Sequence, residues 1–179
     1  MSPSPIKIFI CTNDNQMIGA KVARNSIIKR SPFYENDVEI LLESSIPSFQ
    51  RFFTKPYLRK GRMIEFDKND MQSFTLLRFH IPFLMKFQGS ALVIDPDIFQ
   101  VSEGIEDLMN FDLKTHSIYA RKGLQKNSWG SSAMLISCDQ LSHWSLDDPE
   151  VSKKSSSELL RAPSIGNNEK IRSNRRFDE

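Results

Sequence analysis

The chain has 179 residues, enough for one domain with a buried core, and its apolar (39%) and charged (26%) fractions are those of ordinary soluble proteins. A net charge of +2 gives no reason to expect a nucleic-acid partner, and no apolar run approaches the roughly 20 residues that span a bilayer. The amino-terminal residues lack the apolar core of a signal peptide, so we expect a cytoplasmic protein in which Cys11 and Cys138 are buried and reduced.

The first half of the chain alternates strand-like and helix-like segments. Residues 6–11 (IKIFIC) are typical of a central strand, and the polar residues 12–15 (TNDN) that follow favour a turn or a helix N-cap. Residues 17–30 have helical periodicity, so we predict a helix whose buried face includes Ile18, Val22, Ala23, Ile27 and Ile28. Strands are predicted at residues 38–42 and 62–66.

The second half continues the alternation. We predict helices at residues 73–87 and 105–111 and strands at residues 91–94, 117–120 and 133–137. Pro82 predicts a kink or a restart within the first of these helices. The pattern as a whole predicts an α/β sandwich with a mostly parallel central sheet flanked by helices. We expect this domain to occupy residues 1–147 and residues 148–179 to form a polar, poorly ordered tail.

The sequence Asp95-Pro96-Asp97 follows the apolar run ALVI, and ligands of doubly wound sheets bind beyond the carboxyl ends of the strands. Residues i and i+2 of extended backbone point to the same side, so Asp95 and Asp97 can converge on one cation. Carboxylate oxygens suit Mg²⁺ or Mn²⁺. A plain turn explains the same residues, because Asp and Pro are both favoured in turns.

Other candidate groups have equally simple structural explanations. The TNDN stretch is either a helix N-cap or a place where a carboxylate reads the edge of a base. Arg78 is either a solvated helix residue or a phosphate ligand. The sequence contains no GxGxxG, GxxxxGK[ST] or GxSxG motif, which excludes the commonest dinucleotide, P-loop and hydrolase signatures.

Three blocks of the sequence resemble the GT-A glycosyltransferases, most closely the family 8 type and related bacterial nucleotide-diphospho-sugar transferases. FICTNDNQMIGAKVARNSIIKRS is similar to the opening of that family, SFTLLRFHIPFLMKFQGSALVIDPD to its central block, and SWGSSAMLISCDQLSHW to the block that follows. Three blocks in the family's order over residues 6–147 are more specific than an Asp-x-Asp motif alone.

The resemblance implies a role for each matching residue. Thr12 and Asp14 would line the nucleobase pocket, Arg78 would lie near the donor phosphates, Asp95 near the ribose and the metal, Asp97 on the metal, and Ser131 and Ser132 beside the donor sugar. It also implies Mn²⁺ or Mg²⁺ as cofactor, a UDP-linked hexose as donor, and a hydroxyl group of a glycan or another molecule as acceptor.

The carboxyl-terminal part departs from the family. Its members continue into a segment that supplies a metal-binding histidine, whereas none of the three histidines here follows Trp144. Three hypotheses therefore stand. The first two are a metal-dependent hexosyltransferase and a nucleotide- and metal-binding GT-A module truncated before its acceptor-binding segment. A third is an unrelated α/β interaction protein with a chance Asp-Pro-Asp turn.

The end of the chain carries an excess of basic residues. They favour either a solvated tail or a peripheral contact with anionic lipid, and they are Lys153, Lys154, Arg161, Lys170, Arg172, Arg175 and Arg176.

Overall fold

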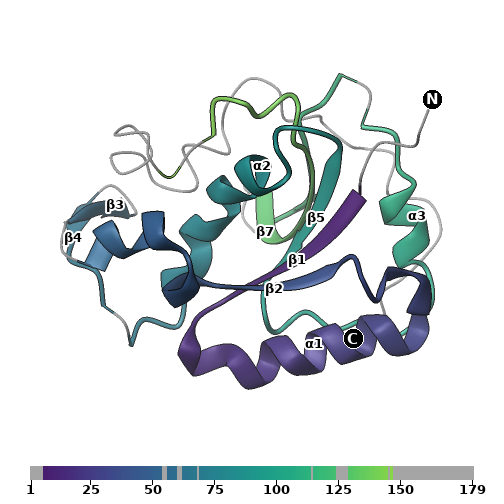
Figure 1. Cartoon of the computed structure of the whole chain (residues 1–179), viewed down its shortest axis with the longest axis horizontal. Helices are drawn as coiled ribbons and strands as arrows, with labels where there is room; N and C mark the ends of the chain where they lie inside the picture. Colours follow the sequence, from purple (N-terminus) through teal and green to yellow (C-terminus); the bar gives the residue numbers. More distant parts are fainter. Residues whose placement is uncertain are drawn as a thin grey trace.

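The computed structural model describes residues 6–53, 56–59, 62–67, 69–113, 115–123, 129–144 and 146. The predicted tail at residues 148–179 lies outside the described residues. The described part forms a central sheet covered by helices on both faces, as the sequence predicts (Figure 1).

The central sheet has five strands in the order β2-β1-β5-β7-β6. They are β1 (Ile6–Thr12), β2 (Val38–Leu42), β5 (Ser90–Ile94), β6 (Ile118–Lys122) and β7 (Trp129–Ser137). β1 pairs in parallel with β2 and β5, while β7 is antiparallel to both β5 and β6. Four of the five strands therefore run in one direction, which confirms a mostly parallel sheet.

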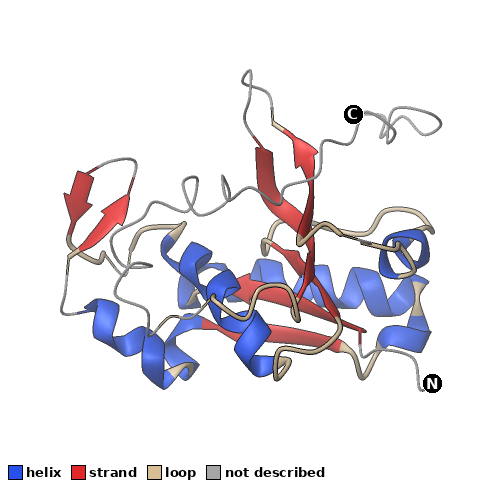
Figure 2. Cartoon of the chain, turned by 90° about the horizontal axis from the view of Figure 1, so that it is seen from above, coloured by secondary structure: helices blue, strands red, loops and turns tan. Residues whose placement is uncertain are grey.

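A second, two-stranded sheet lies apart from the central one (Figure 2). It pairs β3 (Tyr57–Arg59) antiparallel to β4 (Arg62–Ile64). The predicted strand at residues 62–66 is therefore shorter than expected, and it does not join the central sheet.

The two faces of the sheet are buried by different elements. Ile8 and Ile10 of β1 pack with α1 (Met17–Arg30) and α3 (Ile105–Met109), whereas Phe9 and Cys11 pack on the opposite face. That second face is covered by the 3₁₀ helices η4 (Pro47–Phe53) and η5 (Ser73–His80) and by α2 (Ile81–Leu84). The remaining short 3₁₀ turns are η1 (Asp14–Gln16), η2 (Pro32–Tyr34) and η3 (Glu43–Ser45).

Helix α1 has the predicted bounds, and Ala23 and Ile27 of its predicted face are buried. Ile18 and Val22, expected inside, are 79% and 50% exposed. The buried side chains are Ala20, Ala23 and Ile27. Small residues such as Gly19 and Ala20 lie on the side of the helix that faces the turn after β5, because they let the two segments approach closely.

The segment predicted as one helix at residues 73–87 is divided. A 3₁₀ helix runs to His80, and an α-helix restarts at Ile81 with Pro82 in its first turn, where the missing N–H costs nothing. The predicted break at Pro82 is confirmed. The helix ends at Leu84, and positive φ angles at Lys86, Phe87 and Gly89 turn the chain into β5. Leu76 and Leu77 are buried, and the His80 ring stacks on Phe83.

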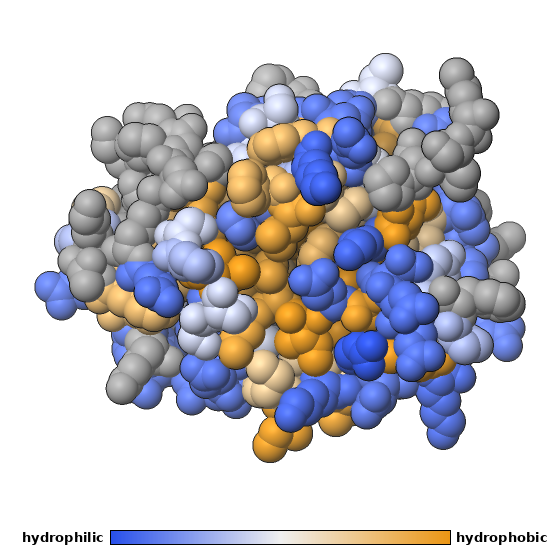
Figure 3. Space-filling model, viewed as in Figure 1, coloured by the Kyte–Doolittle hydropathy of each residue, from blue (hydrophilic) through white to orange (hydrophobic). Residues whose placement is uncertain are grey.

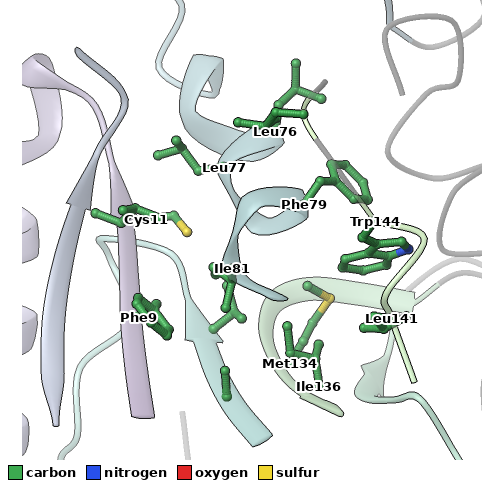
Figure 4. Close-up of a cluster of buried hydrophobic side chains, with 14 of the residues drawn as sticks. Phe9, Cys11, Leu76, Leu77, Phe79, Ile81, Met134, Ile136, Leu141 and Trp144 are labelled. Atoms are coloured by element: carbon green, nitrogen blue, oxygen red, sulfur yellow. The ribbon is translucent and has the colours of Figure 1, made fainter. Parts of the chain in front are cut away.

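The larger of the two cores lies on the η5 face (Figure 4). Phe79 and Trp144 meet edge to face, with ring centroids 4.7 Å apart, and Phe9 and Cys11 point from β1 toward Ile81. Cys11 and Cys138 are buried free thiols, as predicted, and burial raises the pKa of each to about 12.

The molecular surface mixes polar and apolar groups. Figure 3 shows apolar atoms gathered near the middle of one face and bordered by hydrophilic side chains. Among the described residues, no helix has the length and apolar character needed to cross a membrane.

We expect Trp144→Ala to lower the free energy of unfolding by about 3–5 kcal/mol, because it removes a fully buried ring from contact with Phe79. Urea denaturation measures this change. The control is Phe83→Ala, which truncates an exposed ring on α2. Equal effects of the two substitutions would contradict the assignment of Trp144 to the core.

Candidate functional site

Polar residues gather where the parallel strands end. Asp14 follows β1, Glu43 follows β2 and Asp95 follows β5. Because the carboxyl ends of parallel strands meet at one edge, these three segments are neighbours. β7 runs the other way, so its beginning reaches the same edge, where the Asp95 backbone N–H donates to the Ser132 carbonyl at 2.8 Å.

A buried ion pair lies at the centre of this edge. Arg78 Nη2 of η5 lies 3.2 Å from Asp95 Oδ1, and the two side chains are 1% and 17% exposed. Arg78 Nε and Nη1 are also buried, and among the described residues neither has a hydrogen-bond partner. A buried guanidinium normally satisfies its donors, so these two N–H groups are suited to an anionic ligand.

The environment of Asp95 opposes its ionisation. Burial raises its pKa, and the charge of Asp97 adds to that rise, while Arg78 and a side-chain hydrogen bond with Ser132 act in the opposite direction. A nearby cation would favour the charged carboxylate further.

The Asp-Pro-Asp segment is a turn held from several sides. Ile98 N donates to the Asp95 carbonyl at 3.2 Å, Pro96 is buried and Asp97 is exposed. On the α1 side, a Cβ placed on Gly19 would lie 2.9 Å from the Pro96 carbonyl oxygen, so only glycine fits at this contact.

Asp95 and Asp97 are the two candidate metal ligands of this turn. Within the described residues no group of three or more His, Cys, Asp or Glu side chains could enclose an ion. Mg²⁺ sites built from one or two carboxylates take their remaining ligands from substrate phosphates and water. The donor set of this turn fits a metal of that kind.

The TNDN stretch forms the predicted cap. Asn13 Oδ1 accepts from the Gln16 backbone N–H at 3.1 Å at the start of η1. Thr12 is buried, and its hydroxyl donates to the Asn13 carbonyl at 3.1 Å, whereas Asp14 is exposed. The nucleobase contacts of Thr12 and Asp14 stay predictions.

Sequence reasoning missed a second function of Asn13. Its Nδ2 group donates to the Asp70 carbonyl at 3.1 Å and to Ser73 Oγ at 2.9 Å. An N-cap uses only the amide oxygen of an asparagine, so a buried Asn cap predicts that Nδ2 has a partner elsewhere. The sequence does not say where that partner lies.

Glu43 is the other functional candidate that sequence reasoning missed. It directly follows β2, and it is only 4% exposed. Burial raises its pKa from 4.5 to about 7, the charge of Asp14 contributes to the rise, and a side-chain hydrogen bond with Ser73 opposes it. A glutamate immediately after a predicted strand is the signal that could have identified it.

Ser131 and Ser132 lie on β7, beside an irregularity of the sheet. Ala120 of β6 pairs with Met134 and the next residue, Arg121, pairs with Gly130. Ser132 contacts the Asp95 backbone from this segment, so the structure brings it to the candidate site. Contacts of Ser131 and Ser132 with a sugar stay predictions.

Solved glycosyltransferases have a similar fold. A complex of the galactosyltransferase LgtC with donor and acceptor sugar analogues matches 79% of this chain and 61% of its own, with a TM-score of 0.53 and 16% identity. The glycosyltransferase GlyE of Streptococcus pneumoniae TIGR4 matches 94% and 46%, with a TM-score of 0.57 and 12% identity. An active-site mutant of LgtC matches 90% and 71%, with a TM-score of 0.58 and 12% identity.

These likenesses show that the fold is of the GT-A type. The chain spans 61% and 46% of the first two of these structures. No protein-family model and no curated protein sequence matches the chain.

Gly19→Ala tests the contact between α1 and the Asp-Pro-Asp turn. Helix propensity alone predicts a gain of about 1 kcal/mol in stability. The 2.9 Å approach to a backbone oxygen predicts a net loss instead. Chemical denaturation gives the sign, with Asn25→Ala on the exposed side of α1 as control. A stabilised Gly19→Ala variant would contradict the close contact.

Glu43→Gln tests the buried carboxyl group. Because the folded-state pKa is raised from 4.5 to about 7, the folded state binds this proton more tightly than the unfolded state. The stabilisation is complete below pH 4.5 and is lost as the pH rises to about 7, by up to about 3 kcal/mol. Glu43→Gln should lack this part of the pH dependence.

The measurement is the free energy of unfolding of both proteins between about pH 4 and pH 8. Glu39→Gln, on the exposed face of β2, is the matched control. Parallel pH profiles of the wild type and Glu43→Gln would contradict the raised pKa.

Proposed function

We propose that the protein is a glycosyltransferase of the family 8 type, which transfers a hexose from a UDP-linked donor to a hydroxyl group of a glycan or another acceptor. The observation that carries this proposal is the buried Arg78–Asp95 pair at the carboxyl edge of the sheet, with two guanidinium N–H groups left open. The GT-A fold of the chain supports it.

Arg78 binds the donor. Its guanidinium is always charged and presents N–H donors in a planar fork that matches phosphate oxygens. Asp95 accepts a hydrogen bond from Arg78 Nη2 and so orients the guanidinium group. Arg78 Nε and Nη1 can then donate to the diphosphate or the sugar. Because the guanidinium is buried, its hydrogen bonds to an anion are stronger than they would be in water.

Asp95 and Asp97 would hold a Mn²⁺ or Mg²⁺ ion at the turn after β5. When bound, the cation supplies positive charge that offsets the charge developing on the leaving diphosphate. The protein keeps the carboxylates in place through Pro96, which packs against Gly19, and through the hydrogen bond of Asp95 to Ser132.

Thr12 and Asp14 face the nucleobase, with the Asp14 carboxylate accepting a hydrogen bond from the imide of uracil. Ser131 and Ser132 lie beside the donor sugar. Asp14 is exposed at the end of β1, where it is accessible to a ligand. No residue is assigned as a nucleophile.

Calorimetric titration of UDP with Mn²⁺ is the direct test. We expect binding that weakens at least about tenfold when EDTA replaces Mn²⁺ or when Asp97 is changed to Ala, because the first change removes the cation and the second removes a residue that would hold it. Glu103→Ala, on an exposed part of the following loop, is the matched control and should bind normally.

The outcomes separate the hypotheses. Binding of UDP that depends on neither the metal nor Asp97 would contradict the proposed site. Metal-dependent binding together with turnover of UDP-hexose would establish the transferase. Metal-dependent binding without turnover would favour the nucleotide-binding module instead.

A further inference from the structure

We propose that Glu43 is a positioning residue: through Ser73 and Asn13 it holds the loop at residues 13–16 in the conformation that receives the nucleobase. The inference rests on the proposed function, because that function places the base at this loop. It adds a residue from η3, directly after β2, to a site whose other candidates lie on β1, η1, η5, the turn after β5 and β7.

The three side chains form a directed hydrogen-bond chain. Asn13 Nδ2 donates to Ser73 Oγ at 2.9 Å, which leaves the Ser73 hydroxyl proton for one oxygen of the buried Glu43 carboxyl group, while Glu43 Oε2 has no hydrogen-bond partner among the described residues. At the other end, Asn13 Oδ1 accepts from the Gln16 backbone N–H at 3.1 Å. The Asp70 carbonyl and the Gln16 N–H set the orientation of the Asn13 amide, and the Glu43 carboxyl group sets that of the Ser73 hydroxyl, so that its oxygen faces Asn13 Nδ2.

Because these side chains are buried, the loss of one of their hydrogen bonds costs more free energy than it would at the surface. Asn13, Ser73 and Glu43 are all buried, so water does not readily replace a lost partner. Keeping an ionisable group here is costly, as the raised pKa of Glu43 indicates. An apolar residue would avoid that cost, but it would leave the Ser73 hydroxyl without an acceptor.

The chain also connects the base loop to the helix that carries Arg78. Ser73 is the first residue of η5, and Arg78 lies five residues later. Asn13 contacts the Asp70 carbonyl, and Gln16 Nε2 donates to the Met71 carbonyl, so the loop is joined to the segment before η5 at two further points. Movement of the loop is thereby linked to the position of the phosphate-binding arginine.

Hydrogen exchange of the Gln16 backbone amide in the full chain tests the positioning role without any ligand. Glu43→Ala should raise this exchange rate about tenfold, and Ser73→Ala should do the same, because each breaks the chain. Glu43→Gln keeps an acceptor oxygen and should stay near the wild-type rate. Glu39→Ala, on the exposed face of β2, is the matched control.

The Ile10 amide in the central strand reports global opening. An increase confined to the Gln16 amide supports the proposal. Unchanged Gln16 exchange in both Glu43→Ala and Ser73→Ala, or an equal increase at Ile10, would overturn it. If Glu43→Ala does not fold, the comparison of Ser73→Ala with Glu43→Gln decides.

UDP affinity in the presence of Mn²⁺ then tests the link to the nucleotide. We expect Glu43→Ala to weaken binding about tenfold and Glu43→Gln to restore most of it. Unchanged affinity beside faster Gln16 exchange would overturn the nucleotide part of the inference. Absence of UDP binding by the wild type would instead refute the proposed function, and the exchange data would still decide whether Glu43 positions the loop.

Discussion

The ion pair between Arg78 and Asp95 is the interaction on which the site depends. Both side chains are largely buried. Removing one partner from such a pair typically lowers the stability of the protein by about 3–5 kcal/mol, because the other charge stays buried. The pair joins η5 to the turn after β5. The same turn is fixed by the Gly19 contact from α1 and by the Ser132 hydrogen bond from β7. Three elements thus converge on the turn at Asp95 and Pro96, and a ligand would meet a preformed arrangement.

Much of the fold could be predicted from the sequence where short apolar runs form strands. β2 has the predicted bounds, and β1 and β5 extend the predicted strands by one residue each, because their apolar runs leave little alternative. The face of α1 could not be predicted in the same way. Hydrophobicity favours Ile18 and Val22 for the core, but the distance between helix and turn is set by Gly19 and the small residues beside it. Steric fit overrides hydrophobic ranking here.

The residues of the candidate site could be predicted only where they form a pattern with neighbours in the sequence. Asp95 and Asp97 stand two residues apart, and Asn13 has an N-cap pattern of its own. The contact between Asn13 and Ser73 joins residues 60 positions apart, and Glu43 is buried although it lies far from both in the sequence. Propensity and spacing carry no information about such pairs, since the fold alone brings them together.

The irregularity between β6 and β7 has a consequence for substitutions in β7. Among the described residues, positions 131–133 of β7 are skipped by the pairing with β6, while Ala133 still pairs with Ile94 of β5. The part of the hairpin beyond Gly130 is therefore separated from the segment that holds Asp95. A substitution at Gly130 should therefore disturb the Asp-Pro-Asp turn less than one at Ala133, which pairs with the strand that leads into the turn.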